Sequence, residues 1–160
     1  MEEHQRLLHR LAEGPQRLAS MVTRTADEAL DYRDESDGTS ARLLLAHLAD
    51  LEFNLHWTAY VARILYEANP ILASTEKDWR AMEHRYIYQD ARVALGTYTM
   101  ARRHLVTQLR TLSPEAWARQ GTHPERGPQS LQATVEGFLR HDDHHMTRIA
   151  ALLAAFSQRA

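Results

Sequence analysis

Histidines at two separate places in the sequence have the type and spacing to bind a metal ion. The segment "HDDHH", residues 141–145, interrupts a stretch that otherwise reads as one amphipathic helix, and His47 interrupts the leucine-rich segment "LLLAHLADLE". His141 and His145 are four residues apart, so on a helix they differ by about 40° around the axis and about 6 Å along it. The two imidazoles therefore project side by side from one face.

All three histidines fall where packing alone favours leucine. A buried imidazole without a partner costs about 1–3 kcal/mol, so each needs one. A divalent metal ion, bound at about 2.0–2.1 Å from nitrogen, is one solution; a pair four residues apart can share it with a third ligand from a facing helix. Three protein ligands leave a coordination position open for a substrate. Hydrogen-bonded core histidines are the alternative, because a chain with ten histidines produces an H-x-x-x-H pair readily by chance.

The remaining polar candidates are assigned to other roles. His144 points away from His141 and is interpreted as solvent-exposed, and His56 lies nine residues after His47, about 180° around a regular helix, which excludes it from the same site. Five histidines in helix ends, loops or polar contexts are expected at the surface: His4, His9, His84, His104 and His123. The tryptophans, Trp57, Trp79 and Trp117, are interpreted as core or interface anchors.

No clear general base accompanies the three histidines. Asp50 and Asp142 are candidates for orienting the ligand imidazoles through their second nitrogen. They could equally be solvent-facing carboxylates. Gly137, one turn before His141, costs about 1 kcal/mol relative to alanine in a helix. A close approach of another helix explains it most simply, and room for a substrate is the alternative.

The elements that must position these residues are helices, because apolar residues recur at intervals of three and four. The sequence predicts an all-α, four-helix bundle. The first long helix is expected at about Glu3 to Arg24, kinked or broken at Gly14-Pro15, and the second at about Ala41 to Ala68 after a Thr39 or Ser40 cap. The third is expected at about Tyr86 to Leu112 and the fourth at about Ser130 to Ser157. The residues of the third helix expected to point inward are Val93, Met100, Leu105 and Leu109. Ser113-Pro114-Glu115 predicts a short helix that Gly121 closes, and "GTHPERGP" is interpreted as a loop.

Length and composition narrow the class of protein. The chain has 160 residues, which predicts a single domain over residues 1–160. A formal net charge of −2 gives no electrostatic reason to bind nucleic acid or an anionic membrane, and the longest apolar run, "IAALLAAF", is far shorter than the roughly 20 residues of a membrane span. The N-terminus lacks signal-peptide features, so we expect a cytoplasmic protein. Cysteine is absent, so any thiol chemistry requires an external thiol.

The combination of "LLLAHLADLE" with "SLQATVEGFLRHDDHHMTRI", in this order, resembles the DinB/YfiT-like superfamily of four-helix bundles. The resemblance extends from "ALDYRD" to the last helix. It implies a divalent metal ion, often nickel, zinc or iron, held by one histidine of the second helix and two of the last. By position these are His47, His141 and His145. The resemblance also implies a homodimer.

The family resemblance implies two kinds of activity on a small-molecule substrate. Some members are transferases or isomerases that use low-molecular-weight thiols, and many are labelled metal-dependent hydrolases. A metal ion can activate either a thiol or a water molecule as the nucleophile. We expect a metal-dependent transferase that joins a low-molecular-weight thiol to a small electrophile. A metal-dependent hydrolase and a non-enzymatic metal- or ligand-binding stress-response protein remain the alternatives.

Overall fold

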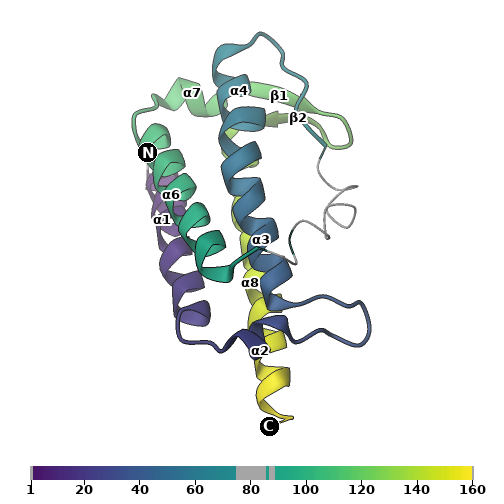
Figure 1. Ribbon diagram of the computed structural model, residues 1–160. Helices are drawn as coiled ribbons and strands as arrows, with labels where there is room; N and C mark the ends of the chain where they lie inside the picture. Colours follow the sequence, from purple (N-terminus) through teal and green to yellow (C-terminus); the bar gives the residue numbers. More distant parts are fainter. Residues whose placement is uncertain (1, 75–85, 87–88, 160) are drawn as a thin grey trace.

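The computed structural model describes residues 2–74, 86 and 89–159 (Figure 1). Four long helical segments run along the molecule, and they confirm the predicted four-helix bundle. The elements are α1 (Glu2–Val22), α2 (Asp27–Asp31), α3 (Ala41–Leu51), the π-helical η1 (Glu52–Val61), α4 (Ala62–Tyr66), α6 (Ala91–Arg110), α7 (Pro114–Ala118), β1 (Gln120–His123), β2 (Gly127–Ser130) and α8 (Leu131–Ser157).

The long helices pack so that each has two neighbours. α1 contacts α6 and α8, and α3 also contacts α6 and α8, so α3 and α8 lie side by side. Figure 1 shows α7 and the two strands gathered at one end of the bundle, while α2 and the C-terminus lie toward the other end. Within the described ranges, no helix has the length and apolar character needed to cross a membrane.

Serine side chains set the start of the two helices that carry the candidate histidines. Ser40 Oγ accepts a hydrogen bond from the Leu43 amide at the start of α3, and Ser130 Oγ accepts one from the Ala133 amide at the start of α8. Each cap satisfies an amide that the first helical turn leaves without a partner. The predicted Ser40 cap and the predicted extent of the last helix are therefore confirmed.

The second long segment changes its helical geometry halfway. α3, η1 and α4 follow one another without interruption from residue 41 to residue 66, close to the predicted range. In η1 the backbone bonds run from one residue to the fifth before it, as in the bond from the Ala62 amide to the Trp57 carbonyl. Each turn of η1 therefore contains more residues than an α-helical turn, which changes the direction in which later side chains point.

Of the two outcomes predicted at Gly14-Pro15, a kink or a break, the break is wrong, since α1 continues through Pro15. Proline has no backbone N–H, so the Leu11 carbonyl four residues earlier loses its helical donor. In the folded protein the buried Arg102 guanidinium approaches that carbonyl, with Nη1 at 3.3 Å. Gly14 makes this approach possible, because a Cβ there would lie 2.8 Å from the Tyr98 hydroxyl oxygen.

The predicted inward face of α6 is only partly correct. Leu105 and Leu109 are buried as expected, but Val93 and Met100 are 60% and 59% exposed. The large buried side chains in this part of the helix are instead Tyr98 and Arg102. The buried face is therefore rotated away from the one that apolar side chains alone predict, because a charged residue occupies it.

Residues 120–130 form a β-hairpin, so the predicted loop over "GTHPERGP" is wrong. β1 and β2 pair antiparallel, with Gln120 opposite Ser130 and His123 opposite Gly127. Gly121 lies within β1 and does not close α7; a Cβ there would lie 2.8 Å from the Leu72 side chain. The hairpin thus packs closely on the segment that follows α4.

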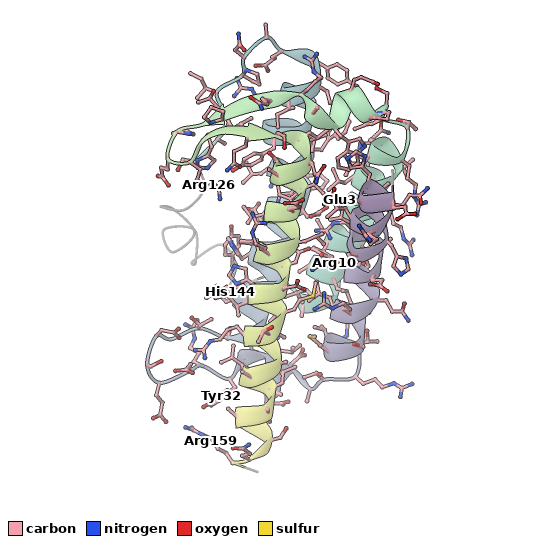
Figure 2. All side chains as sticks on the ribbon, turned by 180° about the vertical axis from the view of Figure 1, so that it is seen from behind. Glu3, Arg10, Tyr32, Arg126, His144 and Arg159 are labelled. Carbon is pink, nitrogen blue, oxygen red and sulfur yellow. The ribbon has the colours of Figure 1, made fainter. Side chains whose placement is uncertain are left out.

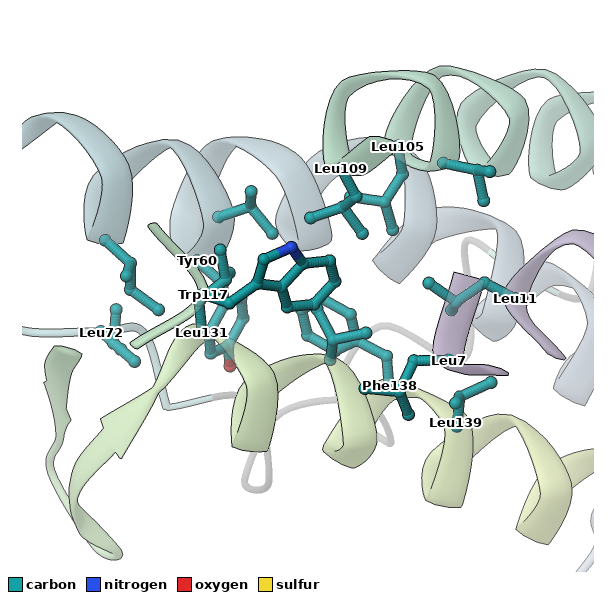
Figure 3. Close-up of a cluster of buried hydrophobic side chains, with 14 residues drawn as sticks. Leu7, Leu11, Tyr60, Leu72, Leu105, Leu109, Trp117, Leu131, Phe138 and Leu139 are labelled. Atoms are coloured by element: carbon teal, nitrogen blue, oxygen red, sulfur yellow. The ribbon is translucent and has the colours of Figure 1, made fainter. Parts of the chain in front are cut away.

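Two apolar clusters fill the bundle. The cluster at the hairpin end surrounds Trp117 with residues of α1, η1, α6 and α8 (Figure 3), which confirms that Trp117 is a core anchor. The second cluster joins α1, α3, α6 and the C-terminal half of α8. The candidate histidines lie on α3 and α8, which both contribute to the second cluster.

Candidate metal centre

The three candidate histidines come together between α3 and α8. His47 lies in the middle of α3 and is 4% exposed, while His141 and His145 lie one turn apart in α8 and are partly buried. Their ligand atoms all lie within 4.8 Å of one another. The positions of the three histidines on two helix faces predict this convergence, with separate hydrogen-bonded core histidines as the alternative.

The distances fit a metal ion. His47 Nε2 lies 3.3 Å from His141 Nε2, and His145 Nε2 lies 3.0 Å from His141 Nε2. In a tetrahedral site with bonds of about 2.1 Å, two ligand nitrogens lie about 3.4 Å apart. Both Nε2 pairs that include His141 thus lie close to the spacing that a common divalent ion requires.

Burial keeps these imidazoles in the neutral form that metal binding needs. It lowers the pKa of His47 and of His145 to about 4, and the pKa of His141 to about 2. Repulsion from the neighbouring histidines lowers the pKa of His141 and His145 further. At neutral pH no proton competes for the nitrogens.

Hydrogen bonding among the three rings does not satisfy them fully. The Nδ1 atoms of His141 and His145 are buried and have no hydrogen-bond partner among the described residues. These Nδ1 atoms lack a partner in both interpretations, since a metal ion would bind through Nε2. The Nε2 atoms distinguish the two: His141 Nε2 faces both His47 Nε2 and His145 Nε2, and one ring nitrogen can hydrogen-bond to only one of them, whereas a divalent cation can bind all three neutral rings.

The two predicted orienting carboxylates have other partners. Asp50 accepts hydrogen bonds from the Tyr86 hydroxyl at 2.7 Å and from the Asn54 amide at 2.6 Å. The prediction for Asp142 is wrong, because its side chain turns into the bundle. There it accepts a hydrogen bond from the Tyr98 hydroxyl at 2.9 Å and pairs with Arg102 Nη2 at 2.7 Å.

A buried ion cluster lies beside the three histidines, and the sequence analysis missed it. Arg102 is 1% exposed and binds both oxygens of Glu52, from Nε at 2.7 Å and from Nη2 at 2.6 Å. The same Nη2 binds Asp142, the residue next to His141. Burial raises the pKa of Glu52, but Arg102 and His56 outweigh it and hold that pKa at about 2. Glu52 is therefore ionised at neutral pH.

His56 belongs to this cluster and not to the three-histidine group, in line with the prediction that excludes it from the same metal site. It is 5% exposed, and its Nδ1 lies 2.6 Å from Glu52 Oε2. The ring stacks on Phe138 of α8, with centroids 3.8 Å apart. The prediction took 100° per residue throughout, whereas residues 52–61 form the π-helical η1, so the ring does not point directly opposite to His47 as a regular helix would require.

A pocket of about 100 Å³ opens next to His141. Its walls include His56, Phe138, Gly137 and Arg126 of the hairpin turn (Figure 2). A Cβ on Gly137 would meet Arg140 Nη2 at 3.7 Å, an ordinary contact with its own helix. The interpretation of Gly137 as a close helix approach is therefore wrong, and the glycine instead leaves room in the pocket.

The other histidines divide into surface and structural residues. His144 is exposed on α8 as predicted (Figure 2), and His9 and His104 are exposed too. His123 is buried, contrary to the prediction, and its Nδ1 accepts hydrogen bonds from the amides of Glu125 and Arg126 in the hairpin turn. The prediction for His84 lies outside the described residues, as does that for Trp79.

Fold and site together define a helical bundle with three convergent histidines suited to a divalent metal ion. The sequence model of the DinB superfamily matches residues 10–149. The chain therefore belongs to the DinB superfamily, which confirms the resemblance seen in the sequence.

Two relatives extend this comparison. A protein of Oceanobacillus iheyensis, named provisionally as a metal-dependent hydrolase, is 29% identical over 140 residues, covering 86% of this chain and 78% of its own length. The structure of YfiT from Bacillus subtilis has a TM-score of 0.87 at 22% identity, over 98% of this chain and 89% of that one. YfiT is described as a probable metal-dependent hydrolase with an unusual four-helix bundle topology.

Proposed function

We propose that the protein is a metal-dependent enzyme in which His47, His141 and His145 hold a divalent ion beside the small-molecule pocket. The observation that carries the proposal is the convergence of three neutral Nε2 atoms at 3.0–3.3 Å spacing around His141. When bound, the cation would supply a Lewis acid that activates a nucleophile at neutral pH. Nickel, zinc and iron all accept imidazole ligands.

We place hydrolysis first among the possible reactions. The support is the relatives, since both the Oceanobacillus protein and YfiT carry the description of a metal-dependent hydrolase. Transfer of a low-molecular-weight thiol to an electrophile is the second candidate. It rests on the family resemblance and on the absence of cysteine, which requires the sulfur to come from a cosubstrate.

The chain's own residues define what a substrate meets in the pocket. Phe138, Leu55 and Tyr60 supply apolar walls, while Arg126 and His56 supply polar groups. A small molecule with an apolar body and a polar reactive group matches these walls. Gly137 keeps the space next to His141 open.

One experiment separates the candidates. Metal analysis of the purified protein by inductively coupled plasma mass spectrometry should find about one divalent ion per chain. The metal-loaded protein is then assayed with 4-nitrophenyl acetate without thiol, and with 1-chloro-2,4-dinitrobenzene plus 2-mercaptoethanol. Hydrolysis without thiol supports the first candidate and thiol-dependent turnover the second. Bound metal without turnover of either probe contradicts an enzymatic role and supports a metal-binding protein.

We also propose a cytoplasmic homodimer, supported by the family resemblance and the sequence composition. Light scattering coupled to size-exclusion chromatography tests the dimer. A particle with the mass of one 18.4 kDa chain would contradict it.

A further inference from the structure

His56 is a buried histidine beside the pocket that the proposed metal site does not use, and its two ring nitrogens have different surroundings. Nδ1 lies 2.6 Å from Glu52 Oε2. Because the Glu52 pKa is about 2, this carboxylate is ionised and can only accept, so Nδ1 carries the proton. Nε2 is therefore the nitrogen that remains for a molecule in the pocket.

The pocket brings His56 next to the metal site. His56 of η1 and His141 of α8 line the same cavity of about 100 Å³. Phe138 covers one face of the His56 ring, at a centroid distance of 3.8 Å and an interplanar angle of 13°. Stacking and the bond to Glu52 fix the ring plane, so that the imidazole does not need to reorganise before a proton transfer.

A second layer of charges fixes Glu52 in turn. Arg102 binds both of its oxygens and also binds Asp142, and all three side chains are at most 3% exposed. Two carboxylates and one guanidinium carry a net charge of −1. A proton on His56 neutralises this charge, so the cluster stabilises the imidazolium that a base becomes.

We propose that His56 is the proton-transfer residue of the pocket, with Glu52 and Arg102 as its positioning residues. The proposal rests on the proposed function and adds the acid–base group that it lacks. His56 Nε2 takes the proton from an attacking O–H or S–H group as its oxygen or sulfur bonds to the electrophilic carbon. The imidazolium then returns this proton to the leaving-group atom as its bond to that carbon breaks.

The kinetic test compares His56→Gln with His104→Gln, a control on the exposed face of α6. Both metal-loaded variants and the wild type are assayed with the two probes given above. We expect His56→Gln to keep its metal and to lose at least about 100-fold in kcat with little change in KM, the usual contribution of a general base. His104→Gln should match the wild type. A fall of less than tenfold, or loss of metal from His56→Gln, would overturn the proposal.

A second measurement requires no turnover and no variant. Nitrogen-15 spectra of the histidine rings in the metal-loaded wild type at neutral pH should show the His56 proton on Nδ1, where Glu52 accepts it, and a bare Nε2. A His56 ring that carries its proton on Nε2 and not on Nδ1 overturns the proposal.

The two measurements distinguish failure of this inference from failure of the proposed function. If the metal-loaded wild type turns over neither probe, the proposed function fails and the spectra alone decide the role of His56. If the wild type is active and His56→Gln is equally active, the metal-dependent function stands and the inference fails.

Discussion

Replacement of Arg102 by methionine tests whether the buried ion cluster holds the bundle together. The guanidinium is 1% exposed and contacts two carboxylates, whose side chains are 0% exposed in Glu52 and 3% in Asp142. Methionine retains much of the aliphatic length but removes the charge and every donor. The variant therefore leaves two buried carboxylates without their cation.

The Glu52 pKa gives the size of the effect. Burial raises this pKa, yet Arg102 and His56 hold it at about 2, against an ordinary value of 4.5. Returning it to 4.5 costs about 3 kcal/mol, since a tenfold change in a protonation equilibrium corresponds to about 1.4 kcal/mol. Breaking a buried ion pair by removing one partner generally costs about 3–5 kcal/mol. We expect Arg102→Met to lower the free energy of unfolding by about 3–5 kcal/mol.

Urea denaturation of the metal-free protein, followed by tryptophan fluorescence, measures this difference. Trp117 is buried in the apolar cluster at the hairpin end of the bundle (Figure 3), so its emission changes when the protein unfolds. Arg103→Met is the matched control, because Arg103 is the exposed neighbour on the same helix and its loss should change stability by at most about 0.5 kcal/mol.

The pH dependence provides a second check. In the wild type the lowered Glu52 pKa contributes stability that is present above pH 4.5 and is lost as the pH falls toward 2. In Arg102→Met, burial without the arginine raises that pKa, so protonation relieves the unfavourable charge as the pH falls. The difference in unfolding free energy between the wild type and Arg102→Met should therefore shrink as the pH is lowered from 7 to 4.5. A loss below about 1 kcal/mol at pH 7, or a difference that does not change with pH, would refute this account of the cluster.

Three further predictions concern the histidine centre and its pocket. His47→Ala and His141→Ala should each lower metal affinity by at least about 100-fold, and full metal content in both by mass spectrometry would show that the ligands are wrongly assigned. Gly137→Ala should retain its metal while kcat/KM falls, because the methyl group enters the pocket; metal loss would instead indicate a structural role. In the metal-free protein His47, whose pKa is lowered to about 4, should contribute about 2 kcal/mol to the fall in unfolding free energy from pH 7.5 to pH 5, because the unfolded chain binds the proton that the folded chain excludes; His141 and His145 contribute in the same direction. Urea denaturation at both pH values measures this slope, which His47→Gln should reduce; an unchanged slope would contradict it.

Local sequence rules were sufficient for most of the helical layout. The caps Ser40 and Ser130 mark helix starts because their hydroxyls satisfy amides within the same turn. The i, i+4 spacing of His141 and His145 places both rings on one face of α8, whatever the rest of the fold does. His47 could be predicted as a third member of the histidine site because it interrupts an otherwise apolar helix face. These features depend on neighbours within one or two turns.

The hairpin and the change of helix geometry were harder to predict. β1 and β2 contain four residues each and lack an alternating apolar pattern, and the hairpin is bonded to a distant segment, with the Thr122 carbonyl accepting a hydrogen bond from the Leu72 amide at 2.8 Å. The π-helical turns of η1 have no composition signal, yet they determine where His56 points. A regular helix would have placed that ring elsewhere.

The sequence by itself determined the four long helices and the positions of the three histidines on two of them, because periodicity and capping act over short range. Only the tertiary structure decided that Glu52, Arg102 and Asp142 are buried. Charged side chains normally face water, and these three are held inside the bundle because the Arg102 guanidinium of α6 pairs with both the Glu52 carboxylate of η1 and the Asp142 carboxylate of α8. These ion pairs require all three helices to be assembled, and no segment of the sequence contains them alone.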